Sequence, residues 1–282
     1  MDLATRSRSD GRGASDDPWA VPVLAPRRNG PADRFATRLR GRHPAAVFFA
    51  AVLAGFALLA ALSIALGLLL TDVVLHSGGI ARSDESIVKS LAEERTPFLT
   101  DASEVGSTVG GAPLLPILVG LIAIACALTR RWVIAGFAVF ALVVESATYR
   151  VTSLAVPRER PHVPRLENLP ADASYPSGHT AAAVAVYVGL VLLITSRFRD
   201  RGLRLAAWVI AMAIPIFVAL SRLYRGMHHP LDLGGGLVVG VGALLVLLFA
   251  CRAANAARAA RRPQRPARFS RTAETRSAQP VA

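Results

Sequence analysis

The sequence predicts an all-α integral membrane protein, in which six transmembrane helices form a bundle and a short amphipathic helical segment lies outside the bilayer. Two observations support this fold class. Of the 282 residues, 53% are hydrophobic, and the mean hydropathy is +0.44, which is too apolar for a soluble domain of this length. The apolar residues also gather in six runs, each near the roughly 20 residues that a helix needs to cross a hydrocarbon core.

The six predicted spans follow one another along the middle of the chain. They are residues 45–70, 106–129, 132–152, 179–196, 204–221 and 233–251. The first run has no polar stripe at helical spacing, which argues against the buried helices of a soluble bundle. Residues 71–104 carry charges and an amphipathic pattern, which predicts an extracytoplasmic helix lying against the bundle.

The two ends of the chain have a different composition. Residues 1–43 and 252–282 are rich in Arg and have no apolar periodicity, which predicts disordered basic tails on either side of a membrane domain at 44–251. The formal charge of +13 would favour a nucleic-acid partner in a soluble protein. Here 23 of the 32 Lys and Arg residues fall on one side of the predicted spans. The positive-inside rule then places both termini in the cytoplasm, and the charge is explained by the bilayer without nucleic acid.

Most of the remaining basic residues lie in or beside two outer loops, where topology alone does not favour them. The first loop ends in "PSGHT", at the start of the fourth span. The first amides of a helix lack intrahelical partners and lie at the positive end of the helix dipole, so they bind phosphate readily. Ser177 and Gly178 are small enough to let an oxyanion approach these amides. In the alternative interpretation, Ser177 caps the helix and Gly178 is a turn residue.

The second loop reads "SRLYRGMHHPLD". In it His228 follows Arg222 by six positions, and Asp232 follows His228 by four. A histidine near a carboxylate can be held in one tautomer and made a better nucleophile. The alternatives are that Arg222 anchors its helix in the interface and that Asp232 complements a helix dipole.

Three blocks together resemble the signatures of the type 2 phosphatidic acid phosphatase family, which shares its site with the vanadium haloperoxidases. They are Arg160-Pro161, "PSGH" at 176–179, and the Ser-Arg, His and Asp spacing of the second loop. The resemblance covers roughly residues 45–251. One position departs from it: the Lys that precedes the family's Arg-Pro by seven residues is Ser153 here.

The resemblance implies a phosphatase that acts on a lipid phosphate or diphosphate of the phosphatidate, phosphatidylglycerophosphate or undecaprenyl diphosphate type. The implied mechanism has His228 attack phosphorus with help from Asp232, while His179 protonates the leaving alkoxide. The implied phosphate ligands are Arg160, Arg222 and the amides at Ser177 and Gly178, with Arg158 or Arg150 in place of the missing Lys. No metal or other cofactor is implied. The site is expected at the extracytoplasmic face of the cell membrane.

Several alternatives remain open at this point. A lipid phosphotransferase or a vanadate-dependent haloperoxidase-like enzyme would use the same residues, and a phospholipid transporter would use the arginines as an anion path. His229 is the rival nucleophile. Glu145, inside the third span, is expected to brace one of the arginines. The sequence does not give the oligomeric state.

Overall fold

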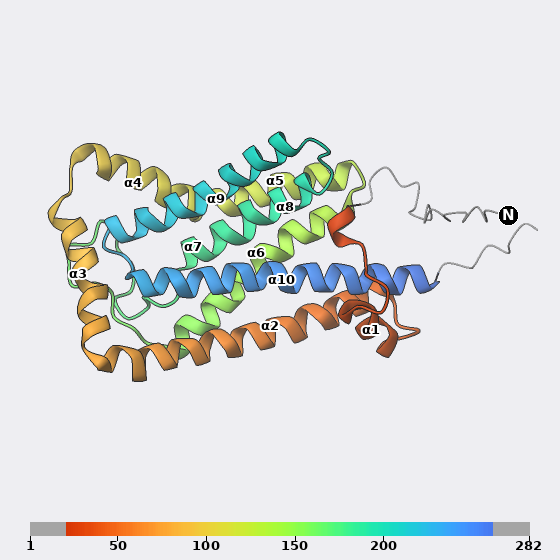
Figure 1. The fold of residues 1–282 in the computed structure, drawn as a ribbon, viewed down its shortest axis with the longest axis horizontal. Coiled ribbons are helices and arrows are strands. Elements are labelled where there is room, and N and C mark those ends of the chain that lie inside the picture. Colours follow the sequence, from red (N-terminus) through yellow and green to blue (C-terminus); the bar gives the residue numbers. More distant parts are fainter. Residues whose placement is uncertain (1–20, 262–282) are drawn as a thin grey trace, which may run out of the picture.

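The computed structural model describes residues 21–261, and within that range the regular secondary structure is helical, with one isolated β-bridge between Arg158 and Ala173 in the loop that follows α6. Figure 1 shows the long helices running side by side. The helices are α1 (Pro31–Arg38), α2 (Pro44–Leu69), α3 (Gly79–Glu93), α4 (Pro97–Gly110), α5 (Leu114–Leu128), α6 (Trp132–Ala155), α7 (Gly178–Ala183), α8 (Gly189–Thr195), α9 (Arg201–Tyr224) and α10 (Pro230–Arg261). Short 3₁₀ or π turns lie at Pro22–Leu24, Leu70–Val74, Leu75–Ser77 and Val184–Val188.

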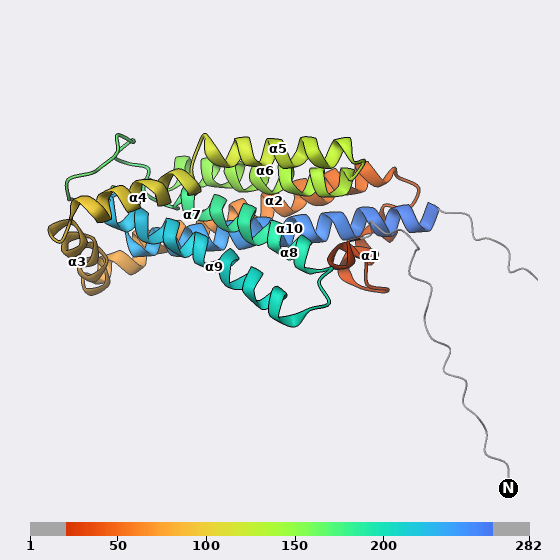
Figure 2. The ribbon, with the colours of Figure 1, turned by 90° about the horizontal axis from the view of Figure 1, so that it is seen from above.

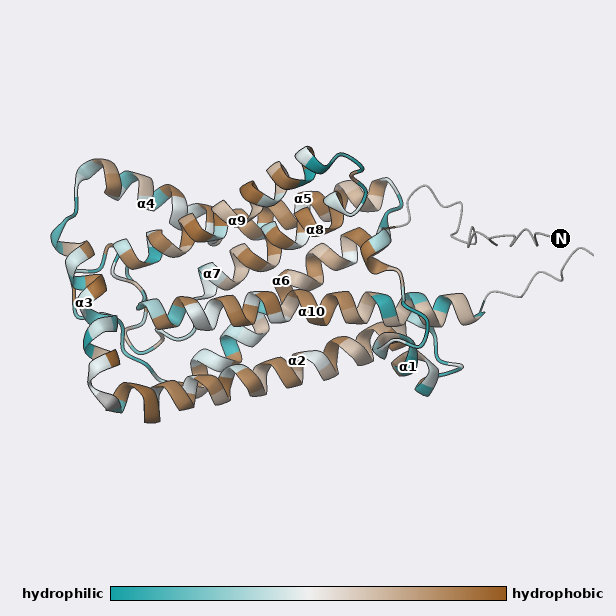
Figure 3. Cartoon of the chain, in the orientation of Figure 1, coloured by the Kyte–Doolittle hydropathy of each residue, from teal (hydrophilic) through white to brown (hydrophobic). Residues whose placement is uncertain are grey.

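The helical architecture confirms the predicted membrane fold. Five helical stretches are long and apolar enough to cross a membrane, counting α7, the π turn and α8 as one stretch from Gly178 to Thr195. A sixth span forms if α4 and α5, which bend by 42° at the break between them, are taken together. In Figure 3 the long helices are mostly hydrophobic, and hydrophilic residues collect at the two ends of the bundle.

The extramembrane segment has different bounds from those predicted. The predicted segment 71–104 contains α3 but also the first half of α4, because α4 already begins at Pro97. The Thr96 side chain caps α4 by accepting a hydrogen bond from the Leu99 amide at 3.3 Å. Figures 1 and 2 show α3 lying across one end of the bundle. Its position there brings polar side chains over the outer loops.

Helix α10 packs against α2, α6 and α7. Close approach to α7 depends on glycine: a Cβ added at Gly236 would lie 2.5 Å from the Ser177 carbonyl oxygen, and one at Gly240 would lie 2.6 Å from the Ala181 carbonyl oxygen. Small residues let helix backbones approach in this way in membrane proteins. This packing holds the starts of α7 and α10 together, and both starts carry candidate site residues.

The predicted disordered tails are wrong for the parts that the structure describes. Residues 21–43 include α1, which packs on an extended α10 that continues past residue 251 to Arg261. Leu24 is also buried. The prediction missed α1 because its short apolar face has no visible partner until α10 is known to be this long. Residues 1–20 and 262–282 of the predicted tails lie outside the described residues.

Candidate active site

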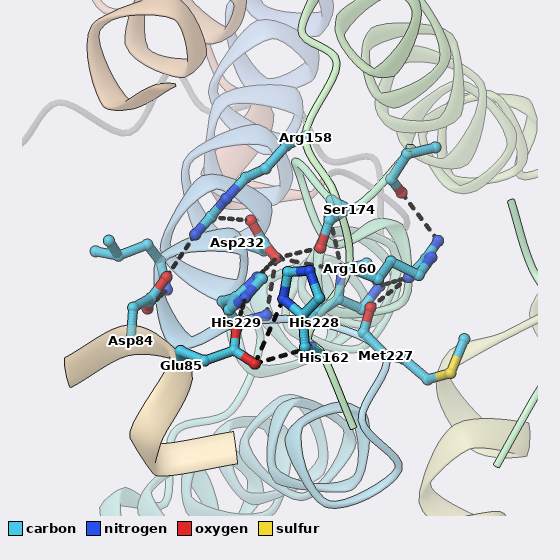
Figure 4. Close-up of polar contacts among 12 residues, drawn as sticks. Asp84, Glu85, Arg158, Arg160, His162, Ser174, Met227, His228, His229 and Asp232 are labelled. Carbon is cyan, nitrogen blue, oxygen red and sulfur yellow. Dashed lines mark hydrogen bonds and ion pairs between the residues drawn. The ribbon is translucent and has the colours of Figure 1, made fainter. Parts of the chain in front are cut away.

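Residues far apart in sequence meet at the end of the bundle that α3 covers. The contributors are α3, α4, the loop after α6, and the ends of α7, α9 and α10 that face that loop. Figure 4 shows the polar contacts among labelled residues of α3, of the loop after α6 and of the segment that leads into α10. The Ser177 amide donates to the Asp232 carbonyl oxygen at 2.9 Å. This bond joins the "PSGHT" block to the loop that carries His228.

His228 is buried, with 3% of its surface exposed. Its Nδ1 lies 2.7 Å from the Ser174 carbonyl oxygen, and its Nε2 lies 3.5 Å from a guanidinium nitrogen of Arg160. A carbonyl oxygen can only accept, so Nδ1 carries the proton and Nε2 keeps its lone pair. Burial lowers the pKa of His228 to about 4, although the Asp232 carboxylate opposes this shift. The imidazole is therefore neutral and has a free nitrogen at neutral pH.

Asp232 is fully buried, and its contacts differ from those expected. Its carboxylate accepts from Ser174 Oγ at 2.6 Å and from the His229 amide at 2.8 Å. The distance from Asp232 Oδ2 to His228 Nδ1 is 3.8 Å, which is too long for a hydrogen bond. Asp232 therefore fixes the loop, and the Ser174 carbonyl oxygen orients the imidazole.

Arg158 is buried between two carboxylates, Asp232 and Asp84 of α3 (Figure 4). Asp84 is also buried, and its other oxygen accepts from the Leu231 amide at 3.1 Å. Arg158 thus links α3 to the start of α10. Arg150, the other candidate replacement for the missing Lys, is exposed on α6 and is not part of the cavity described below.

Arg222 is completely buried at the end of α9. One nitrogen, Nη1, donates to both oxygens of Glu167 at 2.8 and 2.9 Å. Within residues 21–261, the Nε and Nη2 groups of Arg222 have no hydrogen-bond partner. Burial raises the pKa of Glu167, but Arg222 outweighs this effect and brings the pKa to about 2. Arg222 therefore keeps a fixed charge and three N–H groups, one on Nε and two on Nη2, available to an anion.

Arg160 is held by the loop itself. Its Nε donates to the Pro170 carbonyl oxygen at 2.8 Å, and its Nη2 donates to that of Ala173 at 2.9 Å. The Nη1 group donates to the Met227 carbonyl oxygen and faces His228. These bonds fix the guanidinium beside the candidate nucleophile.

His179 and His228 border one cavity of about 230 Å³, together with Arg160 and Gly178. Its remaining walls come from the α4–α5 break, from α6 and from α7, and several are apolar, including Leu115 and Leu142. A Cβ added at Gly111 would lie only 2.5 Å from His179 Nε2. The break between α4 and α5 therefore provides the space that the His179 ring occupies.

The contacts of Ser177, His229 and Glu145 complete the description of the predicted site residues. Ser177 Oγ lies 3.0 Å from Thr180 Oγ1, and Ser177 makes no side-chain cap of the helix. Buried His229 pairs with Glu85 of α3 at 2.9 Å, with Nδ1 3.4 Å from Asp232. Buried Glu145 lines the cavity and accepts from Ser146 at 3.0 Å. Among residues 21–261 no arginine forms an ion pair with Glu145, so the expected brace is not seen.

Sequence reasoning missed four polar residues that hold this site. They are Asp84, Glu85, Glu167 and Ser174. The charged pattern of 71–104 was visible, but an amphipathic helix gives no sign of which of its acids face a site. Glu167 and Ser174 lie in a loop without periodicity, so their partners depend on the loop's path.

Buried His, Arg and Asp side chains at one end of a helical, multi-pass membrane protein are the groups that a membrane phosphoryl-transfer enzyme needs. A family model described as the PAP2 superfamily matches residues 134–256. Phosphatidylglycerophosphatase B of Bacillus subtilis is 24% identical over 181 residues, which are 64% of this chain and 88% of that protein. The undecaprenyl-diphosphatase of Sulfolobus acidocaldarius is 36% identical over 75 residues, 27% of this chain and 32% of that protein.

A solved structure agrees with these matches. The crystal structure of a transmembrane PAP2 type phosphatidylglycerolphosphate phosphatase from Bacillus subtilis has a TM-score of 0.57 and 22% identity, covering 72% of this chain and 93% of that chain. Residues 134–256 match the PAP2 superfamily and hold the candidate site residues of the loop after α6 and of α7, α9 and α10. The matches together support a PAP2-type membrane lipid phosphatase. The family resemblance seen in the sequence is thereby confirmed.

Proposed function

We propose that the protein hydrolyses a lipid phosphate or diphosphate at the extracytoplasmic face of the membrane, through a phosphohistidine at His228. One observation carries the proposal. The neutral His228 and the ring of His179 border the same cavity, and the charge of Arg222, whose Nε and Nη2 have no hydrogen-bond partner among residues 21–261, acts on His228. A tetrahedral anion placed there would meet a nucleophile, a proton donor and a cation together.

In the first step the lone pair on His228 Nε2 forms a bond to phosphorus. The bond from phosphorus to the lipid oxygen breaks, and its electrons stay on that oxygen. Protonated His179 gives the oxygen its proton, so a lipid alcohol leaves, or a lipid monophosphate if the substrate is a diphosphate. The Ser174 carbonyl oxygen keeps the proton on Nδ1 throughout and supports the positive charge on the phosphorylated ring.

In the second step His179, now neutral, takes a proton from water. The resulting hydroxide attacks phosphorus, the bond to Nε2 breaks, and phosphate leaves with His228 restored. Arg160, Arg222 and the first amides of α7 stabilise the charge that spreads over the phosphoryl oxygens. Arg158 supports the loop through Asp232, because its guanidinium lies between two carboxylates.

The cavity walls support a lipid as the substrate. Leu115, Pro116 and Leu142 come from helices α5 and α6, whose outer faces carry exposed apolar side chains. A lipid tail leaving the cavity on this side enters the bilayer directly. The activities named for the matching relatives, phosphatidylglycerophosphate and undecaprenyl diphosphate hydrolysis, fit a phosphate carried on such a tail.

The test uses purified protein in detergent with EDTA present. Phosphate release is measured from phosphatidate, phosphatidylglycerophosphate and undecaprenyl diphosphate. We expect His228→Ala and His179→Ala to lower kcat by roughly 10³-fold, the usual size of a lost nucleophile or general acid. His162→Ala is the matched control, because His162 is exposed at the rim, and it should keep nearly full activity.

A labelling experiment separates the mechanisms. With a radiolabelled substrate, label should attach to wild-type protein in an alkali-stable, acid-labile form, and should be absent from His228→Ala. Label that appears in a second lipid instead of in free phosphate would indicate a phosphotransferase. Full activity in both histidine variants would refute the assignment.

A further inference from the structure

A second cavity lies at the end of the bundle opposite the active site. It has a volume of about 470 Å³ and lies between the first turns of α2 and α6 and the last turns of α10. Helix α10 runs from the active site to this cavity (Figure 1). Asp232 and Arg258 are 26 positions apart on α10, so at 1.5 Å per residue the two sites are separated by about 39 Å. A molecule in this cavity does not reach the catalytic residues.

The walls of this cavity are apolar. Phe48, Val133, Phe137 and Cys251 line it, and α6 presents Gly136 there. A Cβ added at Gly136 would meet nothing within 4 Å, so the glycine leaves open space. The side chain of Trp132 stands at the mouth with 66% of its surface exposed, as expected for an aromatic residue at a membrane interface. A slot of this kind suits an acyl chain and gives a small hydrophilic anion nothing to bind.

The mouth of the cavity is positively charged. Arg258 and Arg261 border it from the end of α10, and His43 borders it from the start of α2. Helices α2 and α6 both begin here, so the positive ends of two helix dipoles face the mouth. Among the described lining residues there is no carboxylate to offset these charges. The arrangement complements a phosphate group and disfavours a headgroup that carries its own cation.

We propose that this cavity binds an anionic glycerophospholipid of the leaflet opposite the active site. Its phosphate lies between Arg258 and Arg261, and one acyl chain fills the slot between α2, α6 and α10. The lipid contacts the ends of three helices, and one of them, α10, begins beside Asp232 at the other end of the bundle. The site is independent of the proposed reaction, so a failure of either proposal leaves the other standing.

The first test uses the position of Trp132. The other two tryptophans, Trp19 and Trp208, are replaced by Phe in the full chain, so that fluorescence reports on the mouth of the cavity. The protein is reconstituted in phosphatidylcholine with small amounts of brominated lipid. We expect brominated phosphatidylglycerol to quench Trp132 several-fold more than brominated phosphatidylcholine at equal mole fraction, and this preference to fall as salt is raised.

Two pairs of variants test the two halves of the site. Arg258→Gln with Arg261→Gln should remove the preference, whereas the control Arg199→Gln with Arg204→Gln, two exposed arginines outside the cavity, should keep it. Gly136→Leu fills the slot and should also remove the preference. Its control, Gly120→Leu, adds the same side chain where a Cβ also meets nothing.

The outcomes distinguish a lipid bound in the cavity from free phosphate and from a diffuse attraction to surface charge. Millimolar inorganic phosphate should leave the preference unchanged, because the slot requires a chain. Equal quenching by the two brominated lipids would overturn the proposal. An equal loss of the quenching preference in both arginine double variants would also overturn the proposal, because it would show that diffuse surface charge attracts the lipid. An unchanged preference in Gly136→Leu would refute the binding of an acyl chain in the slot. Circular dichroism of each variant establishes that a lost preference is not a lost fold.

Discussion

At the residue scale, the negative charge of Asp232 is shared among Arg158, the Ser174 hydroxyl and the His229 amide. Arg158 in turn pairs with Asp84, which belongs to a helix outside the family blocks. Asp84 accepts from Nη2 of Arg158 and Asp232 accepts from Nη1, so the second carboxylate offsets part of the cost of burying this charge. We therefore expect the proposed reaction at His228 to depend on a carboxylate that does not contact it.

Replacing Asp84 by Asn tests this dependence. We expect kcat to fall about tenfold, equivalent to about 1.4 kcal/mol, because Arg158 loses one anchor and the loop loses its fixed position. KM should change little, since Asp84 borders no part of the catalytic cavity. Steady-state kinetics of the variant measure both values. The control is Asp101→Asn, an exposed acid on α4, and equal kcat values in the two variants would contradict the role of Asp84.

The pKa of His228 predicts the acid side of the pH profile. His228 must be neutral to act as the proposed nucleophile, and its pKa of about 4 means that protonation removes the lone pair only near and below pH 4. We expect kcat/KM to fall tenfold per pH unit below about pH 4 after correction for the substrate's own ionisation, measured by phosphorus NMR. The Asp232 carboxylate raises this pKa, so Asp232→Asn should move the limb to lower pH. If kcat/KM instead begins to fall near pH 6.5 because His228 becomes protonated there, the imidazole is not desolvated.

At the scale of elements, the break between α4 and α5 shapes the catalytic cavity. The two helices bend by 42° there, and Gly111 lies against the His179 ring. An unbroken helix would carry side chains through the space that the ring occupies. The sequence predicted a single continuous span at 106–129, because its apolar composition hides a break made by Gly and Pro residues.

Gly111→Ala should therefore damage catalysis more than folding. An added Cβ would lie 2.5 Å from His179 Nε2, so the ring must move. We expect kcat to fall roughly 10²-fold, as displacements of this size commonly cost. Gly120→Ala on α5 is the matched control, because its Cβ meets no atom within 4 Å and activity should persist. Thermal unfolding of both variants separates displacement of His179 from loss of structure, and wild-type kcat in Gly111→Ala would refute the steric role.

At the scale of the whole molecule, hydropathy was sufficient to predict the helical bundle, and short motifs were sufficient to predict the family. The spans follow from apolar runs because the bilayer requires that length and composition. The blocks around His179 and His228 were visible because their spacing is local. Asp84 and Glu167 were not, since their partners lie 74 and 55 positions away and pair only through tertiary packing. The ordered α1 was missed for the same reason.

The orientation of the molecule is the remaining prediction at this scale. The positive-inside rule puts the termini in the cytoplasm, and the end covered by α3 then faces outward. Cysteines are introduced singly at Glu159, an exposed rim residue, and at Arg199, an exposed residue of the loop before α9, after Cys126 and Cys251 are replaced by Ala. A membrane-impermeant maleimide should label intact cells carrying Glu159→Cys and label Arg199→Cys only after permeabilisation. The reverse pattern would place the catalytic cavity in the cytoplasm, and the substrate would then have to be a phosphate of the inner leaflet.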